Sequence, residues 1–259
     1  MSIITSKDNL VIKETIKLKD KKHRKEKGEF FIEGLRFVEE AINSKATVTM
    51  IFFSESFMSK GNSKDILLRA SINTKTYIVK DSIFKALCST QTPQGIAAVI
   101  VESHPSLEDK VGFYLLVDKI QDPGNMGTII RTAHGAGALG VIATKGTVDI
   151  YNEKTLRSTM GSIFNIPIFE EVDSSLIKEL QEKGFKLLAS TPKADKNIYQ
   201  VEIPSKVIIA VGNEGNGISS EIFELIHEKV KLPMPGNTES LNAAVAAGIL
   251  MYEIVRRNA

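Results

Sequence analysis

The chain has 259 residues, of which 42% are hydrophobic and 25% are charged, as in an ordinary globular protein. Its net charge of +2 excludes a general polycation, so any affinity for nucleic acid must come from charge placed locally. Cys88 is the only cysteine, which excludes an internal disulfide and a cysteine-based metal cage, and no apolar run approaches the ~20 residues of a membrane span.

The chain opens on a segment rich in Lys and Arg, KDNLVIKETIKLKDKKHRKEK, at residues 7–27. Its apolar residues predict a helix for the first half, and the second half, KDKKHRKEK, is expected to be solvated. A charge run of this kind is usually an exposed face, and contact with RNA phosphates is the functional alternative. The start lacks the sustained apolar core of a signal peptide, so we expect a cytoplasmic protein.

Helices and strands alternate over residues 30–102. The first predicted helix follows FFIEG and carries Leu35, Val38 and Ile42 on one face. Strands are then predicted over 48–54, 75–80 and 95–102, and helices over 63–72 and 81–88. Asp81 is in position to cap the last of these helices. The pattern indicates a small α/β unit, and SHPSLEDKVG at 103–112 predicts a linker.

A second alternation begins at residue 113 and implies a mostly parallel sheet covered on both faces. The predicted strands span 113–118, 139–144, 167–170, 185–191 and 206–212. The predicted helices span 126–137, 155–166, 175–184, 219–228 and 239–257. We therefore expect an α/β protein with one domain at 1–105, a linker at 106–112 and a second domain at 113–259.

A literal G-x-G-x-x-G occurs at Gly135, Gly137 and Gly140. In a dinucleotide-binding protein such glycines lie between a strand and the helix that follows it, whereas here a helix comes first and a strand follows. Gly135 or Gly137 is better explained as a helix-ending residue that adopts a positive φ. This order disfavours a nicotinamide oxidoreductase.

Three polar loops fall at the predicted carboxyl ends of strands, where open parallel sheets bind their ligands. The loops are 122-DPGN-125, 212-GNEGNG-217 and 232-LPMPGNTESLN-242. Asn125 can cap the helix that follows the first loop, and Arg131 is expected near the positive end of that helix, where an anion binds. Glu214 argues against a phosphate-binding loop. The structural alternatives are a plain helix cap for Asn125, a surface salt bridge for Arg131 and a tight strand-to-helix turn for the glycine-rich loop.

The last segment leads into a helix whose first turns carry almost only small residues. Small side chains allow another backbone to approach closely. A buried helix and a subunit interface both fit this pattern. The small residues are Ala243, Ala244, Ala246, Ala247 and Gly248.

Three segments together, DPGNMGTIIRTA, VGNEGNGIS and LPMPGNTESLNAAVAAGI, resemble the motifs of the SpoU/TrmH family of SPOUT RNA ribose 2′-O-methyltransferases. Residues 1–105 resemble, more loosely, the ribosomal-protein-like α/β substrate-binding domain of this family. The resemblance implies a parallel-sheet SPOUT domain with a deep trefoil knot. It also implies S-adenosylmethionine as cofactor without a metal, RNA as substrate and a homodimer formed through the C-terminal domain.

The resemblance further implies roles for particular residues. Cofactor contacts, mainly through the backbone, are implied for Gly212, Leu232, Leu241 and Ala189. Catalytic positions are implied for Arg131, Asn125, Glu214, Ser240 and Asn242. Because an arginine side chain stays protonated, we expect Arg131 to orient and polarise the 2′-hydroxyl rather than to act as a base. The basic residues 13–27 are then expected to contact RNA.

The two-domain layout resembles the rRNA-modifying branch of the family, so 23S rRNA is the expected substrate and a guanosine its expected target. A tRNA 2′-O-methyltransferase is the alternative within the class. A non-catalytic RNA-binding or ribosome assembly factor is the alternative outside it, because a fold alone does not determine activity.

Overall fold

The computed structural model of the chain describes residues 3–60, 63–70, 72–236 and 238–258. They form two compact units. The first comprises Met1–Ser103 and Tyr151–Glu153, and the second comprises His104–Ile150 and Lys154–Ala259. No pattern in the sequence predicted that residues 151–153 belong with the first unit.

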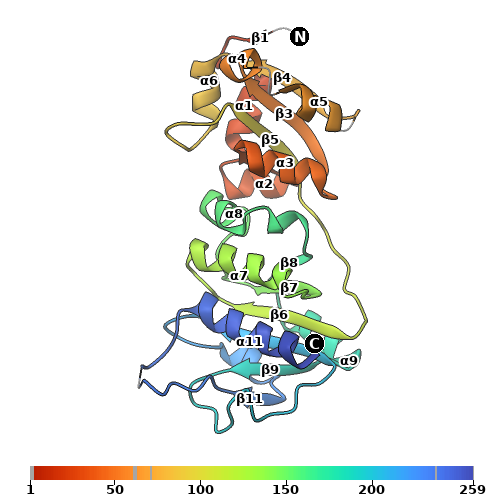
Figure 1. The fold of residues 1–259 in the computed structure, drawn as a ribbon, viewed down its shortest axis with the longest axis vertical. Coiled ribbons are helices and arrows are strands. Elements are labelled where there is room, and N and C mark those ends of the chain that lie inside the picture. The colour runs from red at the N-terminus through yellow and green to blue at the C-terminus, as the bar shows by residue number, and fades with distance from the viewer. Residues whose placement is uncertain (1–2, 61–62, 71, 237, 259) are drawn as a thin grey trace. The chain divides into compact units, whose positions relative to one another are not determined.

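The first unit contains a five-stranded mixed sheet in the order β1-β4-β3-β5-β2 (Figure 1). Strands β1, β3 and β4 run parallel, whereas β5 is antiparallel to both β3 and β2. Alternation of helices and strands did not predict this, because alternation determines neither strand order nor direction. The strands are β1 (Ile3–Ile4), β2 (Glu29–Glu33), β3 (Val48–Ser54), β4 (Lys75–Val79) and β5 (Ile96–Val101).

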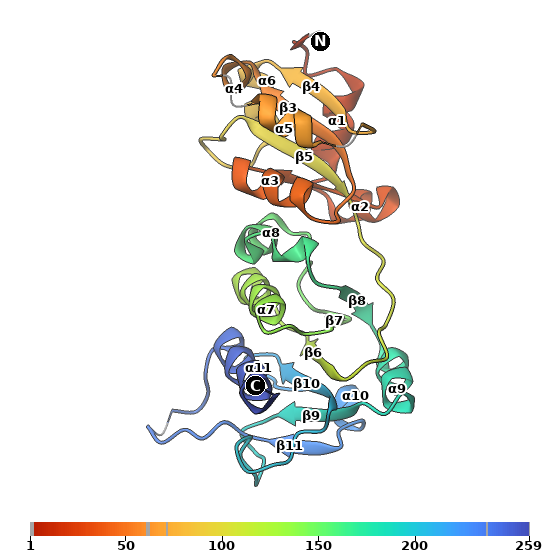
Figure 2. The same ribbon diagram turned by 45° about the vertical axis from the view of Figure 1, so that its right-hand side comes forward.

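Helices pack on the sheet of the first unit. Helices α1 and α6 bury Ile12 and Phe84 against Phe31 and Phe52 of the strands, and α3 and α5 lie on the other face (Figure 2). Cys88 belongs to this core, and burial raises the pKa of its thiol. The helices are α1 (Leu10–Lys17), α2 (Lys21–Lys27), α3 (Leu35–Asn43), α4 (Glu55–Ser59), α5 (Ser63–Arg69) and α6 (Asp81–Leu87).

Three features of the helices in the first unit differ from the prediction. The basic run KDKKHRKEK forms α2, which Asp20 caps by accepting a hydrogen bond from the His23 N–H at 3.1 Å. Lys80 is the N-cap of α6, and Asp81 instead accepts a hydrogen bond from the Ser56 hydroxyl at 3.0 Å, so the predicted cap at 81 is wrong. The predicted helix at 63–72 ends at Arg69, and residue 71 lies outside the described residues.

The second unit contains a six-stranded, entirely parallel sheet in the order β11-β9-β10-β6-β7-β8. The strands are β6 (Gly112–Asp118), β7 (Gly140–Thr144), β8 (Ile168–Val172), β9 (Lys186–Ser190), β10 (Lys206–Gly212) and β11 (Glu228–Val230). Helices α7 (Pro123–Gly135) and α11 (Ala243–Asn258) cover one face, and α9 (Ser174–Glu182) and α10 (Ser220–Phe223) cover the other (Figure 2). The predicted parallel α/β sheet is confirmed. The trefoil knot stays a prediction.

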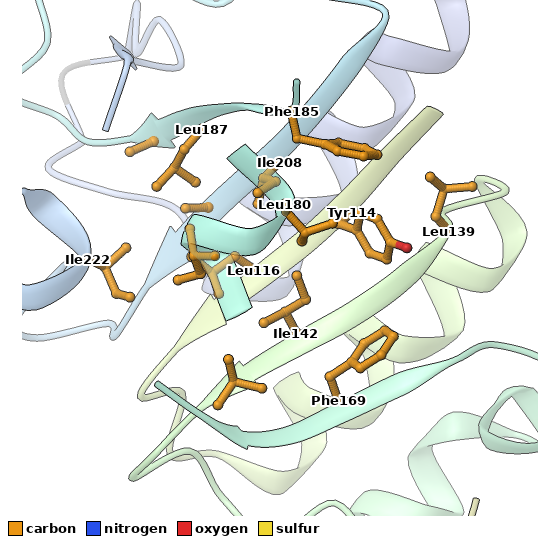
Figure 3. Packing of buried hydrophobic residues seen from close by; sticks show 14 residues of the cluster. Tyr114, Leu116, Leu139, Ile142, Phe169, Leu180, Phe185, Leu187, Ile208 and Ile222 are labelled. Atoms are coloured by element: carbon orange, nitrogen blue, oxygen red, sulfur yellow. The ribbon is translucent and has the colours of Figure 1, made fainter. Parts of the chain in front are cut away.

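One core cluster of the second unit lies between the sheet and helices α9 and α10. Figure 3 shows Leu116 and Ile208 on neighbouring strands, with Leu180 of α9 and Ile222 of α10 packed over them. The Tyr114 hydroxyl reaches from this core to the chain before β6. It accepts a hydrogen bond from the N–H of Glu108 at 2.7 Å and donates one to the carbonyl of the same residue at 3.0 Å. Part of the predicted linker is therefore attached to the second unit.

The helices of the second unit include two departures from the prediction. The expected helix at 155–166 is interrupted because Met160 and Gly161 adopt φ values of 51° and 88°. The expected helix at 219–228 ends at Phe223, and β11, which was not predicted, follows. The helices are α7 (Pro123–Gly135), α8 (Glu153–Thr159), α9 (Ser174–Glu182), α10 (Ser220–Phe223), α11 (Ala243–Asn258) and a 3-10 turn at Ser162–Phe164.

The glycines at the end of α7 behave as the sequence predicted. Helix α7 ends at Gly135, and Gly137 adopts a φ of 71° before β7 begins at Gly140. The literal G-x-G-x-x-G is thus a helix end and not a nucleotide-binding turn. Among the residues that the structure describes, no helix is long and apolar enough to cross a membrane.

Candidate active site

A cleft of about 700 Å³ opens in the second unit where β9, β10 and β11 end. Its volume lies within the range of small-molecule sites, roughly 300–1,000 Å³. Segments far apart in the sequence line it: 190–193, 211–218, 231–234, 238–241 and residues 243 and 246. Residue 237, which belongs to the third predicted loop, lies outside the described residues. The second and third predicted loops therefore meet at one cleft, as expected for the carboxyl ends of parallel strands.

The glycine-rich loop after β10 is closed upon itself. Asn213 and Gly217 exchange two backbone hydrogen bonds, each of 2.9 Å. A Cβ atom at Gly212 would lie 2.3 Å from the carbonyl carbon of Gly217. Glycine is therefore required at position 212 by the backbone of its own loop, before any ligand is considered.

The residues implied to bind the cofactor differ in their access to the cleft. Gly212, Leu232 and Leu241 line it. Ala189 does not line the cleft, because it is 0% exposed within β9, where it pairs with Ala210. The next residue, Ser190, lines the cleft instead.

Three residues implied to be catalytic form one hydrogen-bonded chain. The Asn125 Nδ2 donates to Glu214 Oε1 at 2.7 Å, and the Asn242 Nδ2 donates to Asn125 Oδ1 at 2.9 Å. Glu214 also lines the cleft, as does Ser240. The chain thus joins the first predicted loop to the other two, although the three residues are separated by 89 and 117 positions in the sequence.

Helix caps explain the placement of the two asparagines. Asp122, not Asn125, caps α7: its carboxylate accepts the Asn125 N–H at 2.7 Å, and this bond holds the pKa of Asp122 below its ordinary value. The predicted cap at Asn125 is wrong, and the Asn125 side chain is used for the link to Glu214 instead. Asn242 accepts the Ala244 N–H at 2.9 Å, so α11 begins at Ala243 rather than at 239.

Arg131 lies apart from this group. It is exposed, does not line the cleft, and forms no ion pair or hydrogen bond through its side chain within the described part of the chain. It stands eight residues after Pro123, the first residue of α7, which is more than two turns. A helix dipole acts within the first turn, so the predicted position near the positive end of the helix is wrong.

Sequence reasoning missed several residues that line the cleft, among them Lys193, Lys231 and Phe223. Lys231 directly follows β11, so recognition of that strand would have placed it at the carboxyl edge of the sheet. Phe223 lies beneath the Lys229 ammonium, 4.0 Å from the ring centroid. The cleft thus has charges of both signs. Across the residues described, no group of three or more His, Cys, Asp or Glu side chains could hold a metal ion.

Comparison with known proteins gives matches over both units. Residues 112–252 match the model of the SpoU rRNA Methylase family, and residues 9–98 match that of the MRM3-like substrate binding domain. The chain is 36% identical over 256 residues to the 23S rRNA (guanosine(2553)-2'-O)-methyltransferase RlmP of Bacillus subtilis (strain 168), covering 98% of this chain and 99% of that protein.

Two further matches extend the comparison to a second enzyme and to a solved structure. The chain is 28% identical over 253 residues to the 23S rRNA (uridine(2479)-2'-O)-methyltransferase of Streptomyces viridochromogenes, covering 93% of this chain and 87% of that protein. The AdoMet-bound rRNA methyltransferase from Sinorhizobium meliloti has a similar fold, with a TM-score of 0.87, 27% identity, and coverage of 100% of this chain and 98% of that one.

Proposed function

The chain belongs to the SpoU rRNA methylase family, and on this premise we propose that it transfers a methyl group from S-adenosylmethionine to a ribose 2′-hydroxyl of 23S ribosomal RNA. The observation that carries the proposal is that the second and third predicted loops meet at one cleft, and that the hydrogen bonds of Asn125 to Glu214 and Asn242 link the first loop to them. A guanosine is the proposed target, supported by the guanosine named for the relative that matches almost the whole chain.

The residues of the cleft fit this cofactor. S-adenosylmethionine supplies a methyl group on a positively charged sulfur, next to a carboxylate and a flat adenine. Glu214 offers a negative charge, Lys193 and Lys231 offer positive charges, and Leu232 offers an apolar surface. We assign the cofactor contacts to the backbone of Gly212, Leu232 and Leu241, with Ala189 acting through its strand to place Ser190.

The chain's own residues are proposed to align the ribose. Alignment of two reacting groups can lower a barrier by roughly 7–11 kcal/mol, and this reaction needs no further activation of the methyl donor. The hydrogen bonds from Asn242 through Asn125 fix Glu214 at the cleft, and Ser240 lines the same cleft. Arg131 stays protonated and is proposed to hold an RNA phosphate and polarise the 2′-hydroxyl.

Because Arg131 does not line the cleft of its own chain, we propose a homodimer, formed through the C-terminal domain, in which a second copy supplies it. Val245 and Tyr252 support this: each is 51% exposed on α11, the helix that packs against α7. Apolar groups exposed on one helix face are common at subunit contacts.

The proposed domains are 1–105 for RNA binding, 106–112 as linker and 113–259 for methyl transfer. Lys21, Lys22 and Lys25 cluster on α2 and support RNA binding by the first domain.

Methyl transfer to purified RNA tests the function. The protein should incorporate labelled methyl groups from S-adenosylmethionine into 23S rRNA, and mapping of 2′-O-methyl positions in cells with and without the gene should locate the nucleotide. Methylation of tRNA alone would replace the proposed substrate. Cofactor and RNA binding without transfer to either RNA would point to an assembly factor instead.

Mixing two inactive variants tests the shared site. Arg131→Ala should lose transfer and keep its Kd for S-adenosylmethionine, and Glu214→Gln should also lose transfer. If each site combines Glu214 of one copy with Arg131 of the other, reassembled mixtures should recover about a quarter of the wild-type rate, because half the dimers are mixed and each has one intact site. Full activity of Arg131→Ala would refute the role.

A further inference from the structure

Asp118 is a completely buried carboxylate next to the cleft. It ends β6, is 0% exposed, and uses both of its oxygens. Oδ1 accepts a hydrogen bond from the Thr144 hydroxyl at 2.8 Å, and Oδ2 accepts one from the Ser219 N–H at 2.6 Å. A buried carboxylate is costly unless its oxygens find partners, so its presence here calls for an explanation.

The partners of Asp118 come from the ends of neighbouring strands. Thr144 is the last residue of β7, and Ser219 follows the glycine-rich loop that leaves β10. Strands β10, β6 and β7 are adjacent in the sheet, and Gly212 pairs with Asp118 itself. One side chain therefore links the carboxyl ends of three strands.

The start of the same loop is held by the residue after Asp118. Lys119 adopts a φ of 57°, a conformation that persists only where its surroundings hold it. Its N–H donates to the Thr144 hydroxyl oxygen at 3.1 Å, and its carbonyl accepts from Asn213 Nδ2 at 2.9 Å. The Asn213 Oδ1 then accepts the N–H groups of Gly215 and Asn216 at 2.9 and 3.0 Å.

Both ends of the loop that carries Glu214 are thus attached to the end of β6. Asn213 holds the start through Lys119, and Asp118 holds the end through Ser219. Between them, Glu214 accepts the hydrogen bond from Asn125, and residues 213–218 line the cleft. Asp118 does not line the cleft. The Asp118 side chain is connected to the cleft through its hydrogen bond to the Ser219 N–H, at the end of this loop.

We propose that Asp118 is a positioning residue for methyl transfer, acting through residues 213–219 to fix where Glu214 stands. The inference rests on the proposed function. It requires a side chain with two acceptor oxygens at fixed separation, because one must meet a hydroxyl of β7 and the other a backbone N–H beyond β10.

Four variants separate positioning from stability. Asp118→Asn keeps the shape but replaces one acceptor with a donating amide, so Ser219 N–H and the Thr144 hydroxyl can no longer both donate to it. Thr144→Val removes the hydroxyl, and Thr144→Ser retains it. Thr159→Val is the matched control, because Thr159 is another fully buried hydroxyl of this unit whose bond, to the Leu156 carbonyl at 2.7 Å, stays within α8.

The first measurement follows the loop without any reaction. Hydrogen–deuterium exchange should show faster exchange of the 213–219 amides in Asp118→Asn and Thr144→Val than in Thr144→Ser, Thr159→Val and the wild type. Unchanged protection of this loop in both Asp118→Asn and Thr144→Val would overturn the anchoring. This readout stands even if the protein proves to transfer no methyl group, so it separates the inference from the proposed function.

The second measurement is the rate on 23S rRNA. Asp118→Asn and Thr144→Val should lower kcat by roughly 10²-fold, the loss expected when a positioned group is displaced by about 1 Å, whereas Thr144→Ser and Thr159→Val should not. The double variant Asp118→Asn/Asn125→Asp should be no slower than Asn125→Asp alone, because both substitutions act by displacing Glu214 and residues that act as one unit are non-additive. Independent, additive losses would show that Asp118 does not act through Glu214.

Discussion

Asn125 uses both polar atoms of its side chain, donating to Glu214 and accepting from Asn242. No other residue type of this size offers a donor and an acceptor in one plane. The N–H of Asn125 is separately satisfied by Asp122, so the side chain is not needed to begin α7. Its identity therefore reflects the site and not the helix.

Asn125→Asp tests this reading. The new carboxylate would face Glu214 where a 2.7 Å hydrogen bond now stands, so the two should repel each other. We expect kcat to fall by roughly 10²-fold, because Glu214 would be displaced. The melting temperature should not fall, since a negative charge in the first turn of a helix contributes about 0.3–1 kcal/mol. Thr128→Ala, on an exposed position one turn along α7, is the control. An unaltered rate for Asn125→Asp would remove the link from the mechanism.

Glu253 forms a second polar cluster, on α11. Its side chain is 4% exposed and accepts hydrogen bonds from Arg256 Nε at 2.8 Å and Arg257 Nε at 2.7 Å. Arg257 also donates to the carbonyls of Ile198 and Val201, at 2.8 and 2.5 Å. The last turn of α11 thereby holds the segment 198–201, which follows the cleft residues 190–193.

Stability at low pH should report on Glu253. Hydrogen bonding to Arg256, and next to Arg257, lowers the pKa of Glu253 from 4.5 to about 2, against the opposing effect of burial. A depressed pKa stabilises the fold fully at pH values above the unfolded pKa and loses this contribution as the pH falls towards the folded pKa. Urea unfolding of wild type and Glu253→Gln should therefore differ by a constant amount above pH 4.5 and converge between pH 4.5 and about 2. A gap that stays constant down to pH 2 would contradict the assignment.

At the scale of elements, α7 and α8 meet at Gly127. A Cβ atom there would lie 2.4 Å from the Cβ of Ser158 and 2.6 Å from the carbonyl oxygen of Thr155. Real Cβ atoms do not approach so closely, so the two helices can adopt this separation only with glycine at position 127.

Gly127→Ala should destabilise the protein by about 1–3 kcal/mol, the usual cost of overpacking, despite the better helix propensity of alanine. Gly135→Ala is the matched control in the same helix, because its added Cβ would lie 3.7 Å from the Tyr252 hydroxyl, an ordinary contact. Because Gly135 is the exposed last residue of α7, this substitution should change the stability by less than about 0.5 kcal/mol. Chemical denaturation of both variants checks the pair, and equal effects would show that the α7–α8 contact is not tight.

The elements also show what the sequence could and could not predict. Strands β6 and β10 were predicted almost to the residue, because buried parallel strands read as continuous apolar runs bounded by Gly and Asp. Strand β11 was missed because Glu228, Lys229 and Val230 are too few and too charged to form such a run. The convergence of the second and third loops was expected at the carboxyl ends of strands, although β11, the strand that precedes the third loop, was not itself predicted. The position of Arg131 was wrong because it depended on which residue caps α7.

At the scale of the whole molecule, all the residues that line the cleft belong to the second unit, which has its own core. Residues 104–259 alone should therefore bind S-adenosylmethionine with the Kd of the full chain. Transfer to 23S rRNA should be lost, and RNA binding should depend less steeply on salt, by about 0.7 in log–log slope for each phosphate contact removed. Calorimetry and filter binding measure the two effects. Loss of cofactor binding with RNA binding intact would reverse the roles assigned to the domains.

The order of the cleft residues along the chain matters for synthesis. Every one of them lies between residues 190 and 246, and the polar cluster of Glu253 and Arg257 comes later still in the sequence. During translation the ribosome therefore finishes the first unit and most of the parallel sheet before any wall of the cleft exists. A nascent chain cannot hold the methyl donor before residue 246 has been made, so a copy that ends before this point cannot modify the rRNA of the particle that is making it.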